Sequence, residues 1–170
     1  MHEILFWIII AIIVLDFLFE KYLDYLNTTK WSDVIPDEVK GIYDEEKYKK
    51  QQAYQRENHR FGMLTSSFSF AITLSMFLFY GFALVNGWAW GFTTNAILAA
   101  FIFFGILMFA SDIINTPFSV YDTFKIEEKY GFNKTTPKTF VLDKIKGWLI
   151  SGLIGGGLLA LIIFIYQKFK

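Results

Sequence analysis

The side chains most often used for catalysis or metal binding are scarce in this sequence. It has no cysteine and only two histidines, His2 and His59, which excludes thiol chemistry, cysteine-ligated zinc and a three-histidine metal site. No second histidine lies four residues from His59, so the H-E-x-x-H motif of zinc proteases is missing. Asp16 and Asp112 could in principle share a proton and activate water, but neither lies in a recognisable catalytic motif. We therefore predict no catalytic residue and no metal ligand in this chain, which should be inactive by itself.

The apolar residues are gathered into long blocks. The 170 residues are 54% hydrophobic, and 16 basic side chains balance 16 acidic ones, which leaves no net basic charge to attract a nucleic acid. Crossing a bilayer takes about 20 apolar residues in a helix. Four stretches meet this length, at about 4–23, 61–85, 96–118 and 148–166. We expect a single all-α domain over residues 1–170: a polytopic membrane helix bundle with four transmembrane helices, helical cytoplasmic loops and membrane lipid as its surroundings.

Lysine and arginine are concentrated in two of the connecting segments. Seven lie within 27–60 and six within 119–147, whereas 86–95 has none. Cytoplasmic loops retain positive charge. We therefore expect the N-terminus outside and both charged loops in the cytoplasm, in a bacterial inner membrane or, for a eukaryotic source, the endoplasmic reticulum.

The first charged segment predicts two helices. Pro36 suits a first helical turn and Gly41 would end that short helix. A longer helix should begin at 44–46 and run past Arg60 into the second span, with acids first and bases last, which suits the helix dipole. Charge runs of this kind are most often solvated surfaces, so a solvated extension is the simpler interpretation.

The second charged segment has clear helix-boundary signals. Thr116-Pro117 and Thr136-Pro137 each place a hydroxyl before a proline, which predicts a helix start at each proline. Gly131 should end the first of these helices in a tight turn over 131–133. The aromatic residues here exceed what a solvated hairpin needs, and we expect them to be buried against the first loop or a partner domain. They are Phe118, Tyr121, Phe124, Tyr130, Phe132 and Phe140.

Acidic residues also lie within the apolar stretches. Asp16, Glu20 and Asp24 repeat every four residues and so share one helix face. Such a face must meet protein or water. It could line a water-filled chamber or ion path, or Asp16 could face neighbouring helices while the other two reach the headgroups. Asp112 is expected to be structural, bonding backbone groups freed near Pro117.

Small residues predict two helix-packing faces. They are Gly62, Ser66, Ser69 and Thr73 in the second span, and Gly152, Gly156 and Ala160 in the fourth. Such faces let helices approach closely and indicate contact without indicating a function.

Residues 117–136 carry a specific pattern, PFSVYDTFKIEEKYGFNKTT, which is followed by Phe140, Asp143 and Lys146. It resembles the signature ahead of the fourth span in type I CAAX prenyl proteases, which are zinc-dependent integral-membrane endopeptidases. Residues 35–38 and 43–54 are similar to the N-terminal region of that family. The positions that the resemblance suggests for docking are Pro117, Tyr121, Phe124, Glu127, Glu128, Gly131, Phe132, Asn133, Lys134, Thr136 and Asp143.

The resemblance implies an N-terminal membrane domain. Family members continue with further spans and a cytoplasmic domain that holds zinc through H-E-x-x-H and a downstream glutamate, and neither is found in this sequence. The zinc is thus implied only for a catalytic domain in the same or a neighbouring chain, acting on peptide or membrane-protein substrates. The helices would form part of the wall of an intramembrane chamber, and the turn at 127–133 would dock the catalytic domain. Equally, its glycine and asparagine could simply make a turn.

The sequence is also compatible with two other functions. One is a free-standing four-helix membrane protein that serves as a scaffold or assembly partner. The other is a small proton-coupled transporter using Asp16. The transporter is disfavoured because the sequence shows no internal repeat between its first and second helix pairs.

Overall fold

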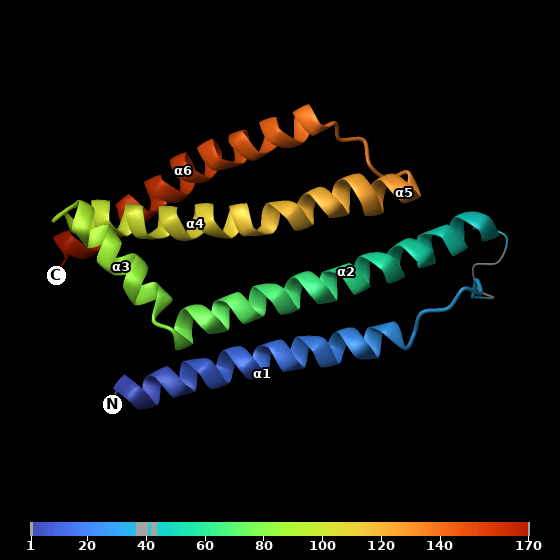
Figure 1. The fold of residues 1–170 in the computed structure, drawn as a ribbon, viewed down its shortest axis with the longest axis horizontal. Coiled ribbons are helices and arrows are strands. Elements are labelled where there is room, and N and C mark those ends of the chain that lie inside the picture. The colour runs from blue at the N-terminus through green and yellow to red at the C-terminus, as the bar shows by residue number, and fades with distance from the viewer. Residues whose placement is uncertain (1, 37–40, 42–43, 170) are drawn as a thin grey trace. The chain divides into compact units, whose positions relative to one another are not determined.

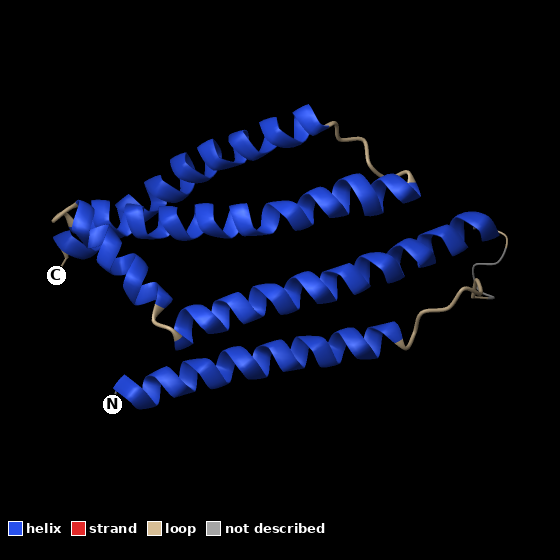
Figure 2. Ribbon diagram, in the orientation of Figure 1, coloured by secondary structure: helices blue, strands red, loops and turns tan. Residues whose placement is uncertain are grey.

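The computed structural model describes residues 2–36, 41 and 44–169, and these residues form helices and connecting turns with no strand among them (Figure 2). The predicted all-α class is confirmed over that part of the chain. In order, the elements are α1 (His2–Thr28), α2 (Glu45–Leu78), α3 (Gly81–Phe92), α4 (Ala96–Tyr121), the π-helix η2 (Asp122–Glu127), α5 (Glu128–Tyr130) and α6 (Pro137–Lys168) (Figure 1). The short helix predicted between Pro36 and Gly41 falls largely on residues 37–40, outside the described residues.

The chain divides into two compact units. The first combines Met1–Tyr80 with Phe124–Phe132, and the second combines Gly81–Thr123 with Asn133–Lys170. The first unit therefore holds α1, α2 and a segment from the second charged loop, and the second unit holds α3, α4 and α6.

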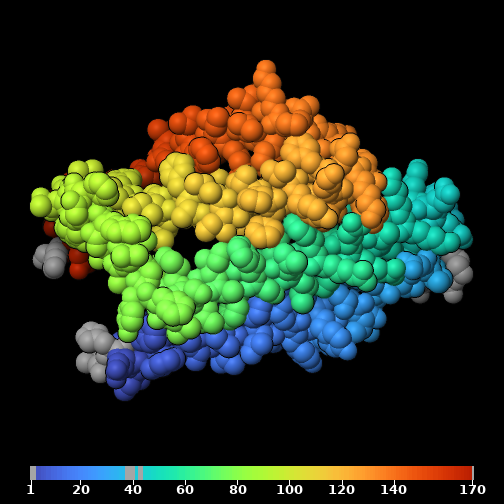
Figure 3. All heavy atoms as spheres, in the orientation of Figure 1, coloured from blue at the N-terminus to red at the C-terminus, as the bar shows by residue number. Residues whose placement is uncertain are grey.

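In the first unit, α1 and α2 lie side by side (Figures 1 and 3). The rings of Phe17 and Phe70 stack with their centroids 3.9 Å apart. Lys21 Nζ donates a 2.6 Å hydrogen bond to Ser66 Oγ. The predicted small-residue face of the second span is thus confirmed at Ser66, because its hydroxyl meets the neighbouring helix.

In the second unit, α3 and α6 both pack against α4. Val85 and Ala89 of α3 and Ala99 of α4 are buried, and Ala89 is fully so. A Cβ at Gly156 would lie 2.9 Å from Phe101 Cε1. The absence of a side chain at Gly156 therefore lets α6 approach the Phe101 ring, which confirms the predicted face of the fourth span at this position.

Most of the predicted helix ends follow their local signals. Asp44 caps α2 and accepts a 2.9 Å hydrogen bond from the Lys47 amide. Thr136 caps α6, with Pro137 in the first turn, and accepts from the Thr139 amide at 3.2 Å. Gly131 is left-handed, with φ of 73°, and ends α5 as predicted.

Pro117 does not start a helix, so that prediction is wrong. It lies inside α4, which runs on to Tyr121. Proline removes one backbone donor from a helix, a loss that membrane helices tolerate. Near Pro117, Thr116 Oγ1 donates to the Asp112 carbonyl at 2.6 Å and Ser119 Oγ donates to the Asn115 carbonyl at 3.2 Å.

The predicted second span, 61–85, is not one continuous helix. α2 ends at Leu78, Tyr80 takes a left-handed conformation with φ of 57°, and α3 begins at Gly81. Residues 86–92, which we expected to be a connector, belong to α3. The apolar sequence continues across the break, so hydropathy alone could not reveal it.

Three helical stretches among the described residues are long and apolar enough to cross a membrane: Glu45–Leu78, Ala96–Tyr130 and Pro137–Lys168. Their large apolar side chains point outward, as Leu153 illustrates at 81% exposure. Such exposure suits a lipid environment, whereas in water it would be an aggregation risk. α1 is not among the three, and its crossing stays a prediction because Asp16, Glu20, Lys21 and Asp24 interrupt its apolar sequence.

Candidate functional site

A polar contact between distant parts of the sequence is centred on Glu57, in the charged half of α2. Its Oε2 atom accepts a 2.6 Å hydrogen bond from Lys129 Nζ and a 2.7 Å hydrogen bond from Tyr130 Oη. The two donors belong to residues 124–132, which we call the docked segment. One carboxylate oxygen therefore holds two consecutive residues of the second charged loop against the first.

Aromatic rings reinforce this contact. The Tyr54 ring, one helical turn before Glu57, meets the Tyr130 ring edge-on at 5.4 Å and the Phe132 ring at 4.7 Å. Edge-to-face pairs at such distances are favourable beyond the area they bury. Tyr130 and Phe132 thus contact the first charged loop, which is one of the two surfaces that we expected. Phe132 nevertheless stays 50% exposed, so its predicted burial is wrong.

The backbone of the docked segment is shaped by two local features. η2 has the wider π-helical turn, and its Ile126 side chain is only 1% exposed. At the end of α5, the Gly131 amide donates to the Glu128 carbonyl and the Phe132 amide donates to the Glu127 carbonyl. These two hydrogen bonds form a Schellman motif, in which the left-handed Gly131 turns the chain and directs Phe132 to Tyr54.

The electrostatics favour an ionised Glu57. It is the only acidic residue within 47–60, a segment with five basic residues, and it lies outside the predicted spans. Hydrogen bonds from Lys129 and Tyr130 hold the pKa of Glu57 below its ordinary value of 4.5. Glu57 is therefore ionised at neutral pH and forms an ion pair with Lys129.

The structure assigns different surroundings to the predicted docking residues. Phe124, Glu127, Glu128, Gly131 and Phe132 all lie in the docked segment. Five others belong to the second unit: Pro117, Tyr121, Asn133, Lys134 and Thr136. Asn133 Oδ1 accepts from the Thr135 amide at 2.6 Å, which makes a local turn.

Asp143 also belongs to the second unit and forms an exposed ion pair with Lys146 at 3.5 Å. Sequence reasoning missed Glu57 and Lys129 as partners. The sequence feature that could have indicated this contact is that Glu57 is a single acidic residue among the basic residues of 47–60.

A second polar cluster links α4 and α6 within the second unit. Asp112 Oδ1 accepts from Lys144 Nζ at 2.7 Å, and Asp112 Oδ2 accepts from Trp148 Nε1 at 3.2 Å. The Trp148 ring also meets Phe109 edge-on at 5.1 Å. The Asp112 side chain thus bonds side chains of the neighbouring helix, and not the backbone groups that we expected it to bond.

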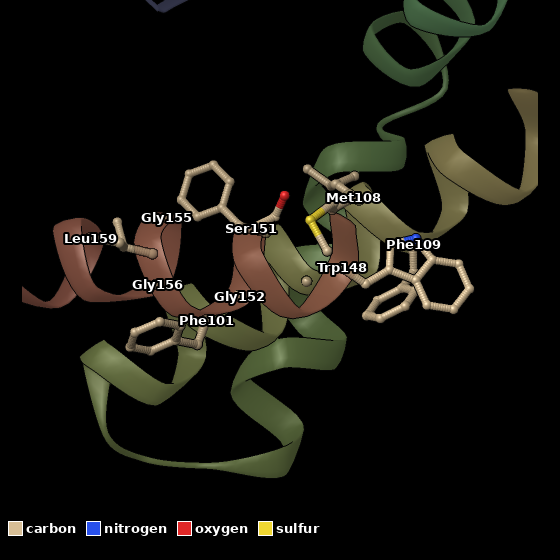
Figure 4. A pocket seen from close by; sticks show the side chains of 12 residues that line it. Phe101, Met108, Phe109, Trp148, Ser151, Gly152, Gly155, Gly156 and Leu159 are labelled. Carbon is tan, nitrogen blue, oxygen red and sulfur yellow. The ribbon is translucent and has the colours of Figure 1, made fainter. Parts of the chain in front are cut away.

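An apolar groove of about 710 Å³ begins beside this cluster and runs between α4 and α6. Figure 4 shows the rings of Phe101, Phe109 and Trp148 along it, with Gly152 and Gly156 on the α6 side. Its walls are mainly aromatic, aliphatic and glycine residues, with the Ser151 hydroxyl among them, so the groove offers chiefly hydrophobic contact.

The remaining acidic residues do not gather into a chemical site. Asp16 and Glu20 are exposed on α1, and Asp24 lies 3.4 Å from Lys21. Among the described residues, no group of three or more histidine, cysteine, aspartate or glutamate side chains could hold a metal ion. The residues described here therefore do not fit a zinc ion, and the role of the acidic face stays a prediction.

Comparison with known proteins places this architecture in a family. A family model described as "CAAX prenyl protease N-terminal, five membrane helices" matches residues 24–170. The chain is 32% identical to CAAX prenyl protease 1 homolog of Arabidopsis thaliana, over 94% of this chain and 40% of that protein. It is 31% identical to CAAX prenyl protease 1 of Saccharomyces cerevisiae, over 91% of this chain and 36% of that protein.

A solved structure supports the same assignment. The crystal structure of S. mikatae Ste24p matches with a TM-score of 0.84 and 29% identity, over 94% of this chain and 39% of that one. The chain thus spans about two fifths of the relatives it matches. The matching family has membrane helices, and this chain has long, apolar helices with exposed side chains. The protein is therefore an integral, multi-pass membrane protein. The chain belongs to the CAAX prenyl protease N-terminal family and corresponds to the N-terminal membrane part of these proteins.

Proposed function

We propose that the chain serves as the membrane-spanning N-terminal part of a zinc endopeptidase of the CAAX prenyl protease type. The observation that carries this proposal is the family match over residues 24–170, together with relatives that are named CAAX prenyl proteases and are more than twice as long as the matched region. Peptides or membrane proteins are the substrate class that this assignment suggests.

The chemistry would be done by residues outside this chain. The described residues offer no set of ligands for zinc. A zinc ion held by a catalytic domain would supply the activated water for peptide hydrolysis. The residues of this chain would then bind, position and enclose the substrate. α2, α4 and α6 would form part of the wall of an intramembrane chamber.

The docked segment and the charged half of α2 are the proposed platform for the catalytic domain. The contact of Glu57 with Lys129 and Tyr130 makes one surface from two loops that are far apart in the sequence. This surface carries exposed charges, including Glu128 and Lys129. In the proposed topology, the N-terminus lies outside and both loops face the cytoplasm, because they carry the lysines and arginines.

A chimera tests the proposal directly. The region of the Saccharomyces cerevisiae relative that matches this chain would be replaced by residues 1–170, and cleavage of a prenylated CAAX peptide would be measured in membranes. We expect zinc-dependent cleavage that a chelator abolishes and added zinc restores. The matched control is the same chimera with both histidines of the relative's H-E-x-x-H motif replaced by alanine, which should be inactive.

An intact but inactive chimera would contradict the proposal. If the chimera reaches the membrane in normal amounts and unfolds at the same temperature as the parent protein, yet cleaves nothing, the chain does not perform the proposed role. Neither the free-standing scaffold nor the Asp16-dependent transporter is favoured by the relatives, which are named as proteases.

A further inference from the structure

A pocket of about 480 Å³ lies in the first unit, where the end of α1 meets the middle of α2. Its lining combines polar and apolar side chains: Thr28, Trp31, Arg56, His59, Arg60 and Met63. Nothing in the docking of residues 124–132 uses it. Two guanidinium groups and an imidazole around one small volume are suited to an anionic ligand, and arginine is well suited to phosphate.

The positive charge of the pocket is only partly neutralised. Arg56 forms a two-pronged ion pair with Asp33, with Nη2 to Oδ1 at 2.9 Å and Nη1 to Oδ2 at 3.0 Å. Glu57, beside these basic residues, is already bonded to Lys129 and Tyr130. Within the part of the chain that the structure describes, no acidic side chain is within ion-pair distance of Arg60. The charge of Arg60 is therefore offset at longer range by Glu57, a carboxylate that already bonds Lys129 and Tyr130, and it stays available to an anion in the pocket.

The pocket also lies at a sharp change in polarity. Arg60 ends the charged half of α2, and residues 61–111 contain no aspartate, glutamate, lysine or arginine. On the apolar side, Met63 follows one turn later, and the Trp31 ring meets the His59 imidazole edge-on at 5.1 Å. Tryptophan is typical of the level of the lipid headgroups. The pocket thus presents positive charge and apolar surface together at the expected bilayer boundary.

We propose that this pocket binds the phosphate of an anionic phospholipid headgroup. Arg60 donates to the phosphate oxygens, Arg56 contributes the guanidinium surface that Asp33 leaves open, and Trp31 with Met63 contacts the glycerol and upper acyl chain. Basic pockets between membrane helices bind anionic headgroups in this way. Free phosphate shares the charge but has no apolar part for Trp31 and Met63.

The test uses the full 170-residue chain, purified in a neutral detergent, with native mass spectrometry of lipid binding. The probes are phosphatidylglycerol, phosphatidylcholine and, in a separate arm, inorganic phosphate. We expect the chain to retain phosphatidylglycerol in preference to phosphatidylcholine, and Arg60→Gln to weaken phosphatidylglycerol binding about tenfold, as for the loss of a charge-assisted hydrogen-bonding group. Arg60→Lys keeps the charge but not the planar guanidinium group. Its binding of phosphatidylglycerol should be weaker than that of the unmodified chain and stronger than that of Arg60→Gln.

Lys49→Gln is the matched control, because it removes one exposed positive charge from the same helix outside the pocket. It should bind phosphatidylglycerol like the unmodified chain. Equal binding by Arg60→Gln and the unmodified chain would overturn the proposal, as would an equal loss in Lys49→Gln. If inorganic phosphate binds as tightly as the lipid and displaces it, the lipid assignment is wrong and the site takes free phosphate. Thermal unfolding by circular dichroism confirms that each variant is folded.

Discussion

Glu57 and Lys129 are separated by 72 residues in sequence, yet their side chains form an ion pair of 2.6 Å. This is the contact that joins the second charged loop to the first. We predict that Glu57→Gln loosens the docked segment, because the amide is a weaker acceptor for Lys129 and Tyr130. Hydrogen exchange of the amides of residues 124–132 should become about fivefold faster, the size expected for a partly exposed ion pair.

Two variants make this prediction specific. Glu20→Gln makes the same change at an exposed position on α1 and should leave the exchange of the docked segment unaltered. In the double variant Glu57→Gln/Lys129→Gln, the amides of the docked segment should exchange no faster than in Glu57→Gln alone, because the two changes remove the same interaction. Additive effects would show that the ion pair does not hold the segment.

The Glu57 carboxylate should also make the stability of the protein fall at acid pH. The folded-state pKa of Glu57 is below its ordinary value of 4.5, chiefly because Lys129 and then Tyr130 donate hydrogen bonds to it. A lowered pKa means that the contribution is fully present above pH 4.5 and is lost as the pH falls through the folded-state pKa. Thermal unfolding of the unmodified chain and of Glu57→Gln, compared at steps from pH 7 to pH 3, should show a constant difference that shrinks only below about pH 4.5. A difference that persists unchanged at pH 3 would contradict this assignment.

Asp112 should matter more for stability than an exposed aspartate on the same unit. Its two oxygens accept from Lys144 and Trp148, and Asp112→Ala would leave both donors on α6 without this acceptor. We expect a loss of roughly 1 to 3 kcal/mol in the free energy of unfolding, measured in detergent. Asp143→Asn, which breaks the exposed ion pair with Lys146, should change that free energy by less than about 0.5 kcal/mol. Similar effects of the two variants would mean that the α4–α6 cluster is not structural.

Gly131 should tolerate asparagine better than alanine. Its φ of 73° is unfavourable for residues with a Cβ, while the nearest atom to an added Cβ, Lys50 Nζ, is at an ordinary 3.7 Å. The cost of Gly131→Ala should therefore come from the backbone, about 1 kcal/mol, and Gly131→Asn should cost less. Unfolding midpoints of the two variants check this order. If both are equally destabilised, steric contact and not backbone conformation is responsible.

Local chemistry explains which features the sequence could predict. Asp44, Thr136 and Gly131 act on backbone groups within a few residues, so their signals did not depend on the rest of the fold. Thr116 and Pro117 carry the same pair of residue types as Thr136 and Pro137, but the preceding apolar helix continues through them. A cap signal alone does not say whether a helix is already under way.

The docking contact could be predicted only in part. An excess of aromatic residues indicated that the second charged loop packs against something, and Tyr130 and Phe132 do contact Tyr54. The choice of Glu57 as the polar partner depends on long-range geometry. Its isolation among basic residues was a signal, but no spacing rule links positions 57 and 129.

The break at Phe79 and Tyr80 limits the length of each continuous helix that can cross the bilayer. α3 has 12 residues, which at 1.5 Å per residue measure about 18 Å, whereas the hydrocarbon layer is about 30 Å thick. The apolar part of α2, residues 61–78, measures about 27 Å and comes close to the full thickness. α3 by itself is thus too short to join the two leaflet surfaces, and accessibility tags placed at residues 79 and 94 should report the same aqueous compartment.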